Sequence, residues 1–312
     1  MADCQLSTER INLKRLFTFG CSFTQYQWPT WADILGREFD FFENWGRSGG
    51  GNHFVFNSLN ECVIRNKLEK NDTVVIMWTN IYREDRYAKN QWITLGNIYG
   101  QSQEFLDKNF VKYSDYRGYL IRDLAFIHAS KKILDQIGVK YIFLSMVPIS
   151  YIDQYNKVEA TNVADVISLY KETIDFIRPS IYETIFNCDW TSKPFSSNKL
   201  FDSWILDDQI KNIYDTHRGT DWPLYEDYVL KRFSTIPISI LNEIDQKINK
   251  LYTRIDLHPT PIEHLEYLDL VLLEIPISEN TRNWTKEIDK NVRLNIDLDT
   301  IWKKNIRSPN RL

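Results

Sequence analysis

The sequence predicts an α/β fold of three layers, in which a parallel sheet of five strands lies between two layers of helices. Two observations support this prediction. Short apolar runs alternate with helical patterns along the first 185 residues, which is typical of a doubly wound sheet. The runs, such as residues 74–77, are apolar at every position, as expected for parallel strands that are covered on both faces.

The individual elements follow from apolar runs, helical spacing and end signals. Gly138 is a C-cap signal after a long helix, and Pro261 is a first-turn signal before the last one. The expected strands are Lys14–Phe19, Asp40–Trp45, Thr73–Trp78, Lys140–Met146 and Tyr182–Phe186, and the expected helices are Trp31–Glu38, Asn52–Lys70, Tyr116–Ile137 and Pro261–Leu272.

The chain is expected to form one domain, residues 1–275, followed by a C-terminal extension, residues 276–312. Two long insertions, at about residues 82–113 and 189–228, are polar and rich in aromatic residues. Insertions of this length usually serve as lids or binding loops, so we expect them to overhang the functional edge of the sheet. Their tryptophans are expected to form an aromatic rim there: Trp92, Trp190, Trp204 and Trp222.

Composition narrows the class of protein. The chain has 312 residues, of which 43% are hydrophobic and 26% charged, with a formal net charge of −4. Without a long basic run, nucleic acid is not an expected partner. Four widely spaced cysteines give neither a zinc ribbon nor a disulfide framework. No apolar leader or bilayer-length apolar run is visible, so we expect no membrane partner and a cytoplasmic chain, or one released by other means.

A serine follows the first predicted strand, at the sheet edge where open α/β folds carry their chemistry. Ser22 lies in the segment Gly20-Cys21-Ser22-Phe23-Thr24. Cys21 is a rival nucleophile, but neighbours on a turn point different ways, and we interpret it as a small buried hydrophobe. Thr24 replaces the second glycine of a Gly-x-Ser-x-Gly elbow, which argues against the larger α/β-hydrolase fold.

A nucleophilic serine needs a base, and His258 is the best placed of the five histidines. Asp256 precedes it by two residues, and a carboxylate there would fix the imidazole tautomer and stabilise the imidazolium. The alternative for Asp256 is the N-cap of the closing helix. Of the others, His128 is expected to pack, His264 to face solvent or to pack, and His53 is a candidate to line the site.

Four short blocks together resemble the SGNH/GDSL hydrolase family. They are residues 20–24, 44–49, 78–80 and 256–259, in that order. The resemblance covers about residues 14–272 and implies a flavodoxin-like sheet. Taken block by block, it implies that Ser22 is the nucleophile, Gly49 a backbone donor, Asn80 a side-chain donor and His258 the base.

The blocks depart from the family pattern in three places. Cys21 stands where the family commonly has Asp, and Asn80 is all that remains of the Gly-x-Asn-Asp block. Asp256 lies two residues before the histidine rather than three. Divergent members with Gly-Cys-Ser-Phe-Thr and Asp-x-His-Pro segments occur, many of them in phages and bacteria, so association with a virion is one implication.

The amides of Ser22 and Gly49 with the side chain of Asn80 would form an oxyanion hole. The glycine-rich segment 46–51 matches neither a P-loop nor Gly-x-Gly-x-x-Gly, which argues against a phosphate cradle. The alternative for Asn80 is a turn residue at a strand end. Three further residues are expected to bind the substrate: Arg83, Asn52 and Trp222. Either Arg83 or Arg86 is expected to line the pocket and to hold an anionic group of the substrate or the carboxylate of Asp256.

The expected activity is hydrolysis of an ester, most simply an O-acyl or O-acetyl group on a carbohydrate, without metal or organic cofactor. Two alternatives remain open: an O-acyltransferase, and an inactive carbohydrate-binding module on the same fold. A metal hydrolase is a rival, because Asp215-x-His217 and Asp256-x-His258 are ligand-like pairs, but no His-Glu-x-x-His is present. The oligomeric state is left open.

Overall fold

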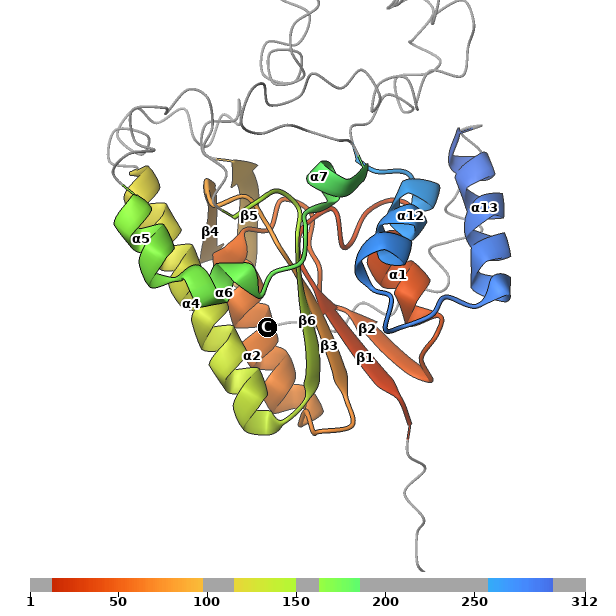
Figure 1. Ribbon diagram of the computed structural model, residues 1–312, viewed down its shortest axis with the longest axis horizontal. Coiled ribbons are helices and arrows are strands. Elements are labelled where there is room, and N and C mark those ends of the chain that lie inside the picture. The colour runs from red at the N-terminus through yellow and green to blue at the C-terminus, as the bar shows by residue number, and fades with distance from the viewer. Residues whose placement is uncertain (1–12, 98–114, 150–162, 186–257, 294–312) are drawn as a thin grey trace, which may run out of the picture.

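The computed structural model describes residues 13–97, 115–149, 163–185 and 258–293. Within these ranges the centre of the molecule is a parallel sheet of four strands in the order β2-β1-β3-β6. Helices α2 and α4 cover one face, and α1 and α12 cover the other (Figure 1). The strands are β1 (Arg15–Phe19), β2 (Phe41–Asn44), β3 (Thr73–Trp78) and β6 (Lys140–Ser145).

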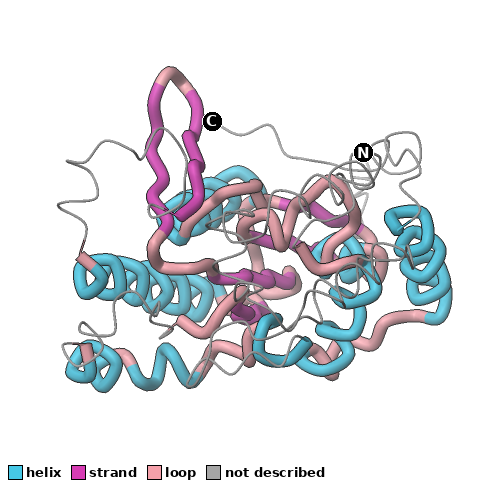
Figure 2. The backbone as a smooth tube through the Cα atoms, turned by 90° about the horizontal axis from the view of Figure 1, so that it is seen from above, coloured by secondary structure: helices cyan, strands magenta, loops and turns pink. Residues whose placement is uncertain are grey.

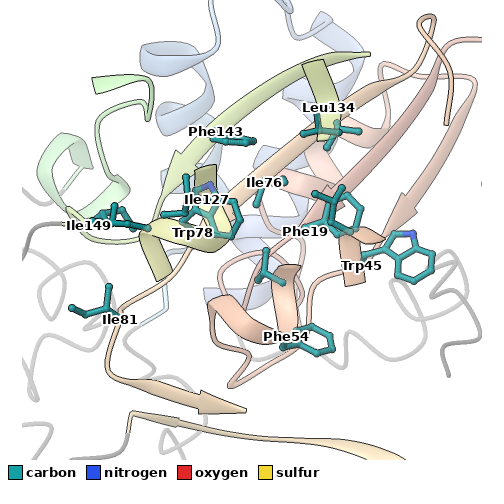
Figure 3. Packing of buried hydrophobic residues seen from close by; sticks show 14 of the residues in the cluster. Phe19, Trp45, Phe54, Ile76, Trp78, Ile81, Ile127, Leu134, Phe143 and Ile149 are labelled. Carbon is teal, nitrogen blue, oxygen red and sulfur yellow. The ribbon is translucent and has the colours of Figure 1, made fainter. Parts of the chain in front are cut away.

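Alternate side chains of each strand enter two separate cores. Leu16, Val75 and Leu144 face α1 and α12 in one core. Phe19 and Ile76 face α2 and α4 in the other, whose packing is shown in Figure 3. Both faces are therefore apolar, which explains why the strands read as continuous hydrophobic runs. The four strand predictions in this sheet are confirmed, each within one residue at either end.

The predicted helices are also present. Gly138 ends the long helix α4 in the left-handed conformation, with φ of 76°, as a C-cap glycine should. Among the described residues, no helix combines the length and the apolar composition needed to cross a bilayer. The helices of these layers are α1 (Trp31–Gly36), α2 (Asn52–Asn66), α4 (Tyr116–Ile137) and α12 (Pro261–Val271), with the short α5 (Ala164–Leu169) and α6 (Lys171–Asp175) beside α4.

The fifth strand, predicted at Tyr182–Phe186, is wrong. Ile181–Ile185 form a short helix, α7, and the described residues contain four strands in the parallel sheet. Ser180 and Glu183 build a reciprocal cap at its start: the Ser180 amide donates to the carboxylate at 3.0 Å, and the Glu183 amide donates to Ser180 Oγ at 3.2 Å. This Ser-x-x-Glu signal outweighs the local apolar pattern.

The first insertion begins with an antiparallel hairpin, β4 (Arg83–Ala88) and β5 (Gln91–Asn97), which stands out from the body in Figure 2. Lys89 and Asn90 form its two-residue turn, both with positive φ, which suits the twist of paired strands. These two strands are not among those predicted from the sequence. Residues 98–113 and the whole second insertion lie outside the described residues.

The C-terminal extension contains a helix, α13 (Glu279–Arg293), that the sequence analysis did not assign. Helix α13 lies beside α12 in Figure 1. Its Ile288 and Val292 form a buried apolar cluster with Trp28. The apolar positions recur at helical spacing in an otherwise polar segment, which is the signal that could have found this helix. The domain boundary at residue 275 stays a prediction.

Candidate active site

The turn after β1 requires glycine at position 20. Its φ is +155°, and a Cβ atom there would lie 2.1 Å from Thr24 Oγ1. The carbonyl of Cys21 accepts hydrogen bonds from the amides of Thr24 and Gln25, at 2.9 and 3.0 Å, which closes the turn. Ser22, nearly buried, is therefore held just beyond the carboxyl end of a central strand.

Cys21 points the other way. Its side chain is fully buried in the core beneath α1 and α12, with Sγ 3.8 Å from the sulfur of Met146. This is the environment of a small hydrophobic residue rather than of a nucleophile.

His258 meets Ser22 across 236 positions of sequence, with Nε2 2.8 Å from Oγ. In the tautomer whose Nε2 carries no hydrogen, the serine hydroxyl donates to the imidazole. The histidine precedes α12, whose N-cap is Thr260, with Pro261 in the first turn and Glu263 completing a capping box. The start of that helix therefore fixes the position of the histidine backbone.

Aromatic rings surround the imidazole. The ring of Tyr26 stacks on it, with 3.9 Å between centroids and 18° between planes, and the ring of Phe23 lies tilted at 5.2 Å. His264, which lies on α12, is also buried. Burial first, and the neighbouring charge of His258 second, lower the pKa of His264 to about 3. His264 is thus neutral at physiological pH and adds no positive charge beside His258.

Two other histidines have contacts with residues other than Ser22 and His258. His53 stacks on the ring of Phe126, with 5.5 Å between centroids. His128 Nδ1 lies 3.1 Å from Thr173 Oγ1, between α4 and α6. Both are packing residues, and His217 lies outside the described residues.

A buried network of polar side chains stabilises the turn that carries Ser22. The carbonyl of Thr24 accepts hydrogen bonds from Asn44 Nδ2 at 2.7 Å and from Thr30 Oγ1 at 2.6 Å. Asp33 accepts from the Asn44 side chain at 3.2 Å and from the Thr30 amide at 3.0 Å. Burial raises the pKa of Asp33 to about 6, against the opposing effect of these hydrogen bonds. The network is absent from the sequence-based predictions, although Thr30-x-x-Asp33 has the spacing of a capping box.

The hairpin supplies the cap of α2. The Asp85 carboxylate accepts from the amides of Gly51 and Phe54, both at 2.8 Å, at the helix N-terminus, where negative charge is favoured. Burial raises the pKa of Asp85, whereas those two hydrogen bonds and the charge of Arg83 act to lower it. This contact joins elements 34 residues apart and has no local sequence signal.

The hairpin also holds the glycine-rich loop. Gly49 has φ of +76°, and a Cβ atom there would lie 2.2 Å from the carbonyl oxygen of Thr94, so only glycine fits. Thr94 Oγ1 donates to the carbonyl of Ser48 at 2.9 Å, and Arg83 Nη1 donates to the carbonyl of Gly50 at 2.9 Å. The loop conformation therefore depends on β4 and β5.

Arg83 lies between the glycine loop and the end of β6. Its Nη2 is 3.6 Å from the sulfur of Met146, and its Nε is buried without a hydrogen-bond partner. Among the described residues no carboxylate lies within ion-pair distance of this guanidinium. Arg86, the other candidate, is exposed on the hairpin and faces Glu84 at 3.6 Å.

Asn80 follows β3, beside the strand that precedes Ser22. Its Oδ1 accepts from the amide of Tyr82 at 2.8 Å, the arrangement of an Asx turn. Within the described part of the chain its Nδ2 has no hydrogen-bond partner. The turn thus fixes the amide plane and leaves the donor end available.

The prediction that Asn52 binds the substrate needs correction. Its side chain is fully buried, with Nδ2 donating to the carbonyl of Thr79 at 3.1 Å and to Asp123 Oδ2 at 2.8 Å, while Oδ1 accepts from the Thr79 amide at 2.8 Å. All of its polar atoms are occupied, so it cannot contact a substrate. Instead it holds the backbone before Asn80. Asp123, which completes this contact from α4, was missed because only the fold brings it near.

Several candidates lie outside the described residues, including Asp256. Trp92 is described, and its ring packs against His53 and Phe54, with centroids 5.4 and 5.7 Å away, as part of the packing around α2. Across the described ranges, no three His, Cys, Asp or Glu residues are grouped so that they could hold a metal ion. The candidates outside the description are Asp256, Trp222, Trp190, Trp204, Asp215 and His217.

Comparisons with known proteins give structural likenesses alone. No protein-family model matches the chain, and no curated protein matches it. Among solved structures it is similar to a member of the lipolytic G-D-S-L family from Veillonella parvula, at 13% identity and a TM-score of 0.33, over 59% of this chain and 87% of that one.

Two further solved structures are a GDSL-like lipase from Bacteroides thetaiotaomicron and an acetylxylan esterase variant from Geobacillus stearothermophilus. The first has 14% identity and a TM-score of 0.31, over 57% of this chain and 73% of that one. The second has 13% identity and a TM-score of 0.30, over 52% and 70%. Likenesses at this level assign neither family nor activity, so function is inferred from the site itself.

The raised pKa of Asp33 predicts a pH-dependent stability. With a pKa of about 6 in the folded protein against an ordinary value of 3.8, this carboxyl favours folding fully below pH 4 and loses that contribution as the pH rises through 6. The unfolding free energy of Asp33→Asn should therefore rise relative to the wild type between pH 4 and pH 7, by about 2–3 kcal/mol. Urea unfolding at several pH values measures this.

The exposed Asp175→Asn variant is the control, and it should change the unfolding free energy little, because it removes one exposed ion pair, with Lys171. A stability difference for Asp33→Asn that stays constant with pH would contradict the interpretation.

Proposed function

We propose that this protein is a serine hydrolase of SGNH type that cleaves an ester by transferring the acyl group to Ser22 and then to water. The observation that carries the proposal is the 2.8 Å contact between Ser22 Oγ and His258 Nε2 at the carboxyl edge of the sheet. His258 would remove the hydroxyl proton as Oγ attacks the carbonyl carbon, and would return it to the leaving oxygen.

An oxyanion hole completes the proposed chemistry. The Ser22 and Gly49 amides and Asn80 Nδ2 are the proposed donors, which would stabilise the charge that appears only in the tetrahedral transition state. The donor end of Asn80 that no described residue occupies, and the close packing that fixes the loop at Gly49, support this assignment.

Asp256 is the proposed acid that holds the tautomer of His258. Its alternative role as the N-cap of the closing helix loses support, because Thr260 is the N-cap of α12. Arg83 and Trp222 are proposed to contact the substrate. The guanidinium of Arg83 has no ion-pair partner among the described residues, which suits recognition of a polar or anionic substrate group.

The proposed substrate is a small or glycan ester with an O-acyl or O-acetyl group, and no cofactor is required. The same residues would serve an O-acyltransferase if a sugar hydroxyl replaced water in the second step. An inactive carbohydrate-binding module is disfavoured by the retained contact between Ser22 and His258. Adding sugar acceptors to an ester-cleavage assay separates hydrolysis from transfer.

A fluorophosphonate probe tests the proposal, because it labels only an activated serine. We expect the wild type and Cys21→Ala to be labelled and Ser22→Ala to remain unlabelled, as read by mass spectrometry of the intact protein. The Cys21 variant controls for the neighbouring thiol. Labelling that persists in Ser22→Ala would place the reactive group at another residue, and a wild type that is never labelled would favour the binding module. Either result would contradict the proposal.

Asn80→Asp separates an oxyanion donor from a turn residue. Asp keeps the oxygen that accepts from the Tyr82 amide but replaces the donor with an anion. We expect kcat for p-nitrophenyl acetate to fall by about 10²- to 10³-fold with little change in Tm. The control is Asn60→Asp, which removes a donor to the Phe56 carbonyl on α2 and should keep kcat. If Asn80→Asp lowers Tm and leaves kcat intact, Asn80 acts in the turn alone.

Asp256→Asn tests the proposed acid. Loss of the carboxylate would favour the wrong tautomer of His258, and we expect kcat to fall by about 10³- to 10⁴-fold at unchanged Tm. Asp215→Asn, in the other Asp-x-His pair, is the matched control and should keep the wild-type rate. A wild-type rate for Asp256→Asn would remove this residue from the mechanism, and a loss in both variants would favour the metal-binding alternative.

A further inference from the structure

The imidazole of His258 is confined by rings rather than by hydrogen bonds alone. Tyr26 covers one face at 3.9 Å, nearly parallel, and Phe23 approaches at 5.2 Å. Rings at these positions hinder rotation of the imidazole about its own bonds, so Nε2 stays directed at Ser22.

Trp28 holds both the tyrosine and the histidine backbone. Its ring packs edge-on against Tyr26, with 4.5 Å between centroids, and its Nε1 donates to the carbonyl of Pro259 at 2.9 Å. Pro259 follows His258 directly in the chain. One nearly fully buried side chain therefore sets the position of the stacking ring and of the peptide next to the imidazole.

Helix α13 packs against Trp28. Ile288 and Val292 form a separate apolar cluster with Trp28, apart from the two cores of the sheet. Asp289, between them, accepts from the amide of Ile262 at 3.0 Å, in the first turn of α12. The extension thus contacts Trp28 and the first turn of α12, the helix that follows His258.

An ion pair fastens the two helices at their other end. Arg282 donates to the carboxylate of Asp269, with Nη1 2.7 Å from Oδ2. Together with Asp289, it fixes α13 along the length of α12, so that the apolar cluster on Trp28 stays closed.

We propose that Tyr26 and Trp28, supported by α13, form a brace that positions His258. The inference rests on the function proposed above. Tyr26 and Trp28 are positioning residues in this account: neither reacts, but both keep Nε2 within hydrogen-bond distance of Ser22. Misplacement of a reacting group by about 1 Å can lower a rate about 10²-fold, which sets the scale of the expected effect.

The test compares Tyr26→Leu, Tyr26→Phe and Trp28→Phe with a matched control, Tyr267→Phe. Trp28→Phe loses a hydrogen bond to the carbonyl of Pro259, and Tyr267→Phe loses one of 2.8 Å to the carbonyl of Pro179. The two losses should lower Tm similarly, so only a positioning role separates their effects on turnover.

We expect Tyr26→Leu and Trp28→Phe to lower kcat for p-nitrophenyl acetate by about 10- to 100-fold, with KM changed by less than about two-fold. Tyr26→Phe keeps the stacked ring and should retain the wild-type rate, and Tyr267→Phe should retain it despite its lower Tm. Wild-type kcat in Tyr26→Leu and Trp28→Phe, or an equal loss in Tyr267→Phe, would overturn the proposal.

Motion of the imidazole is a second readout that does not depend on catalysis. In protein labelled with ¹⁵N-histidine, the imidazole signals of His258 are assigned by their loss in His258→Gln. Their ¹⁵N relaxation should indicate a more mobile ring in Tyr26→Leu and Trp28→Phe, and an unchanged one in Tyr267→Phe. Unchanged mobility would overturn the brace. A wild type that neither cleaves the ester nor takes up the fluorophosphonate would instead reject the proposed function, while this readout still decides the brace.

Discussion

The hydrogen bond between Ser22 and His258 is the constraint on which the rest of the site depends. It joins the first strand to the last helix of the α/β layers, across 236 positions of sequence, at a distance of 2.8 Å. Such a distance holds only if the turn after β1 and the start of α12 are both fixed. Glycine at position 20 and the capping box at Thr260 supply these conditions locally.

Two elements outside the parallel sheet also fix parts of the candidate site. The hairpin β4–β5 holds the glycine loop through Arg83 and Asp85, and α13 holds the histidine side through Trp28. Each is an addition to the α/β layers, and each contacts one half of the candidate site. Rigid elements keep reacting groups within narrow limits better than isolated loops do, which gives both additions a physical role in the proposed chemistry.

Much of the fold could be read from the sequence because its signals are local. The sheet strands are continuous apolar runs, and the serine turn is marked by Gly20. The predictions failed where a longer-range or competing signal decided the outcome. Ser180 caps a helix where a strand was expected, and Asn52 is occupied by Thr79 and by Asp123, a residue 71 positions away. No local pattern reports contacts of that kind.

A crystal structure of the protein after reaction with a fluorophosphonate would test the central claim most directly. The account predicts a covalent bond from Ser22 Oγ to phosphorus, with the phosphonyl oxygen within hydrogen-bond distance of Asn80 Nδ2 and the amide of Gly49, and with His258 still beside Oγ. A phosphonyl oxygen directed away from these donors, or phosphorus attached to another residue, would contradict it.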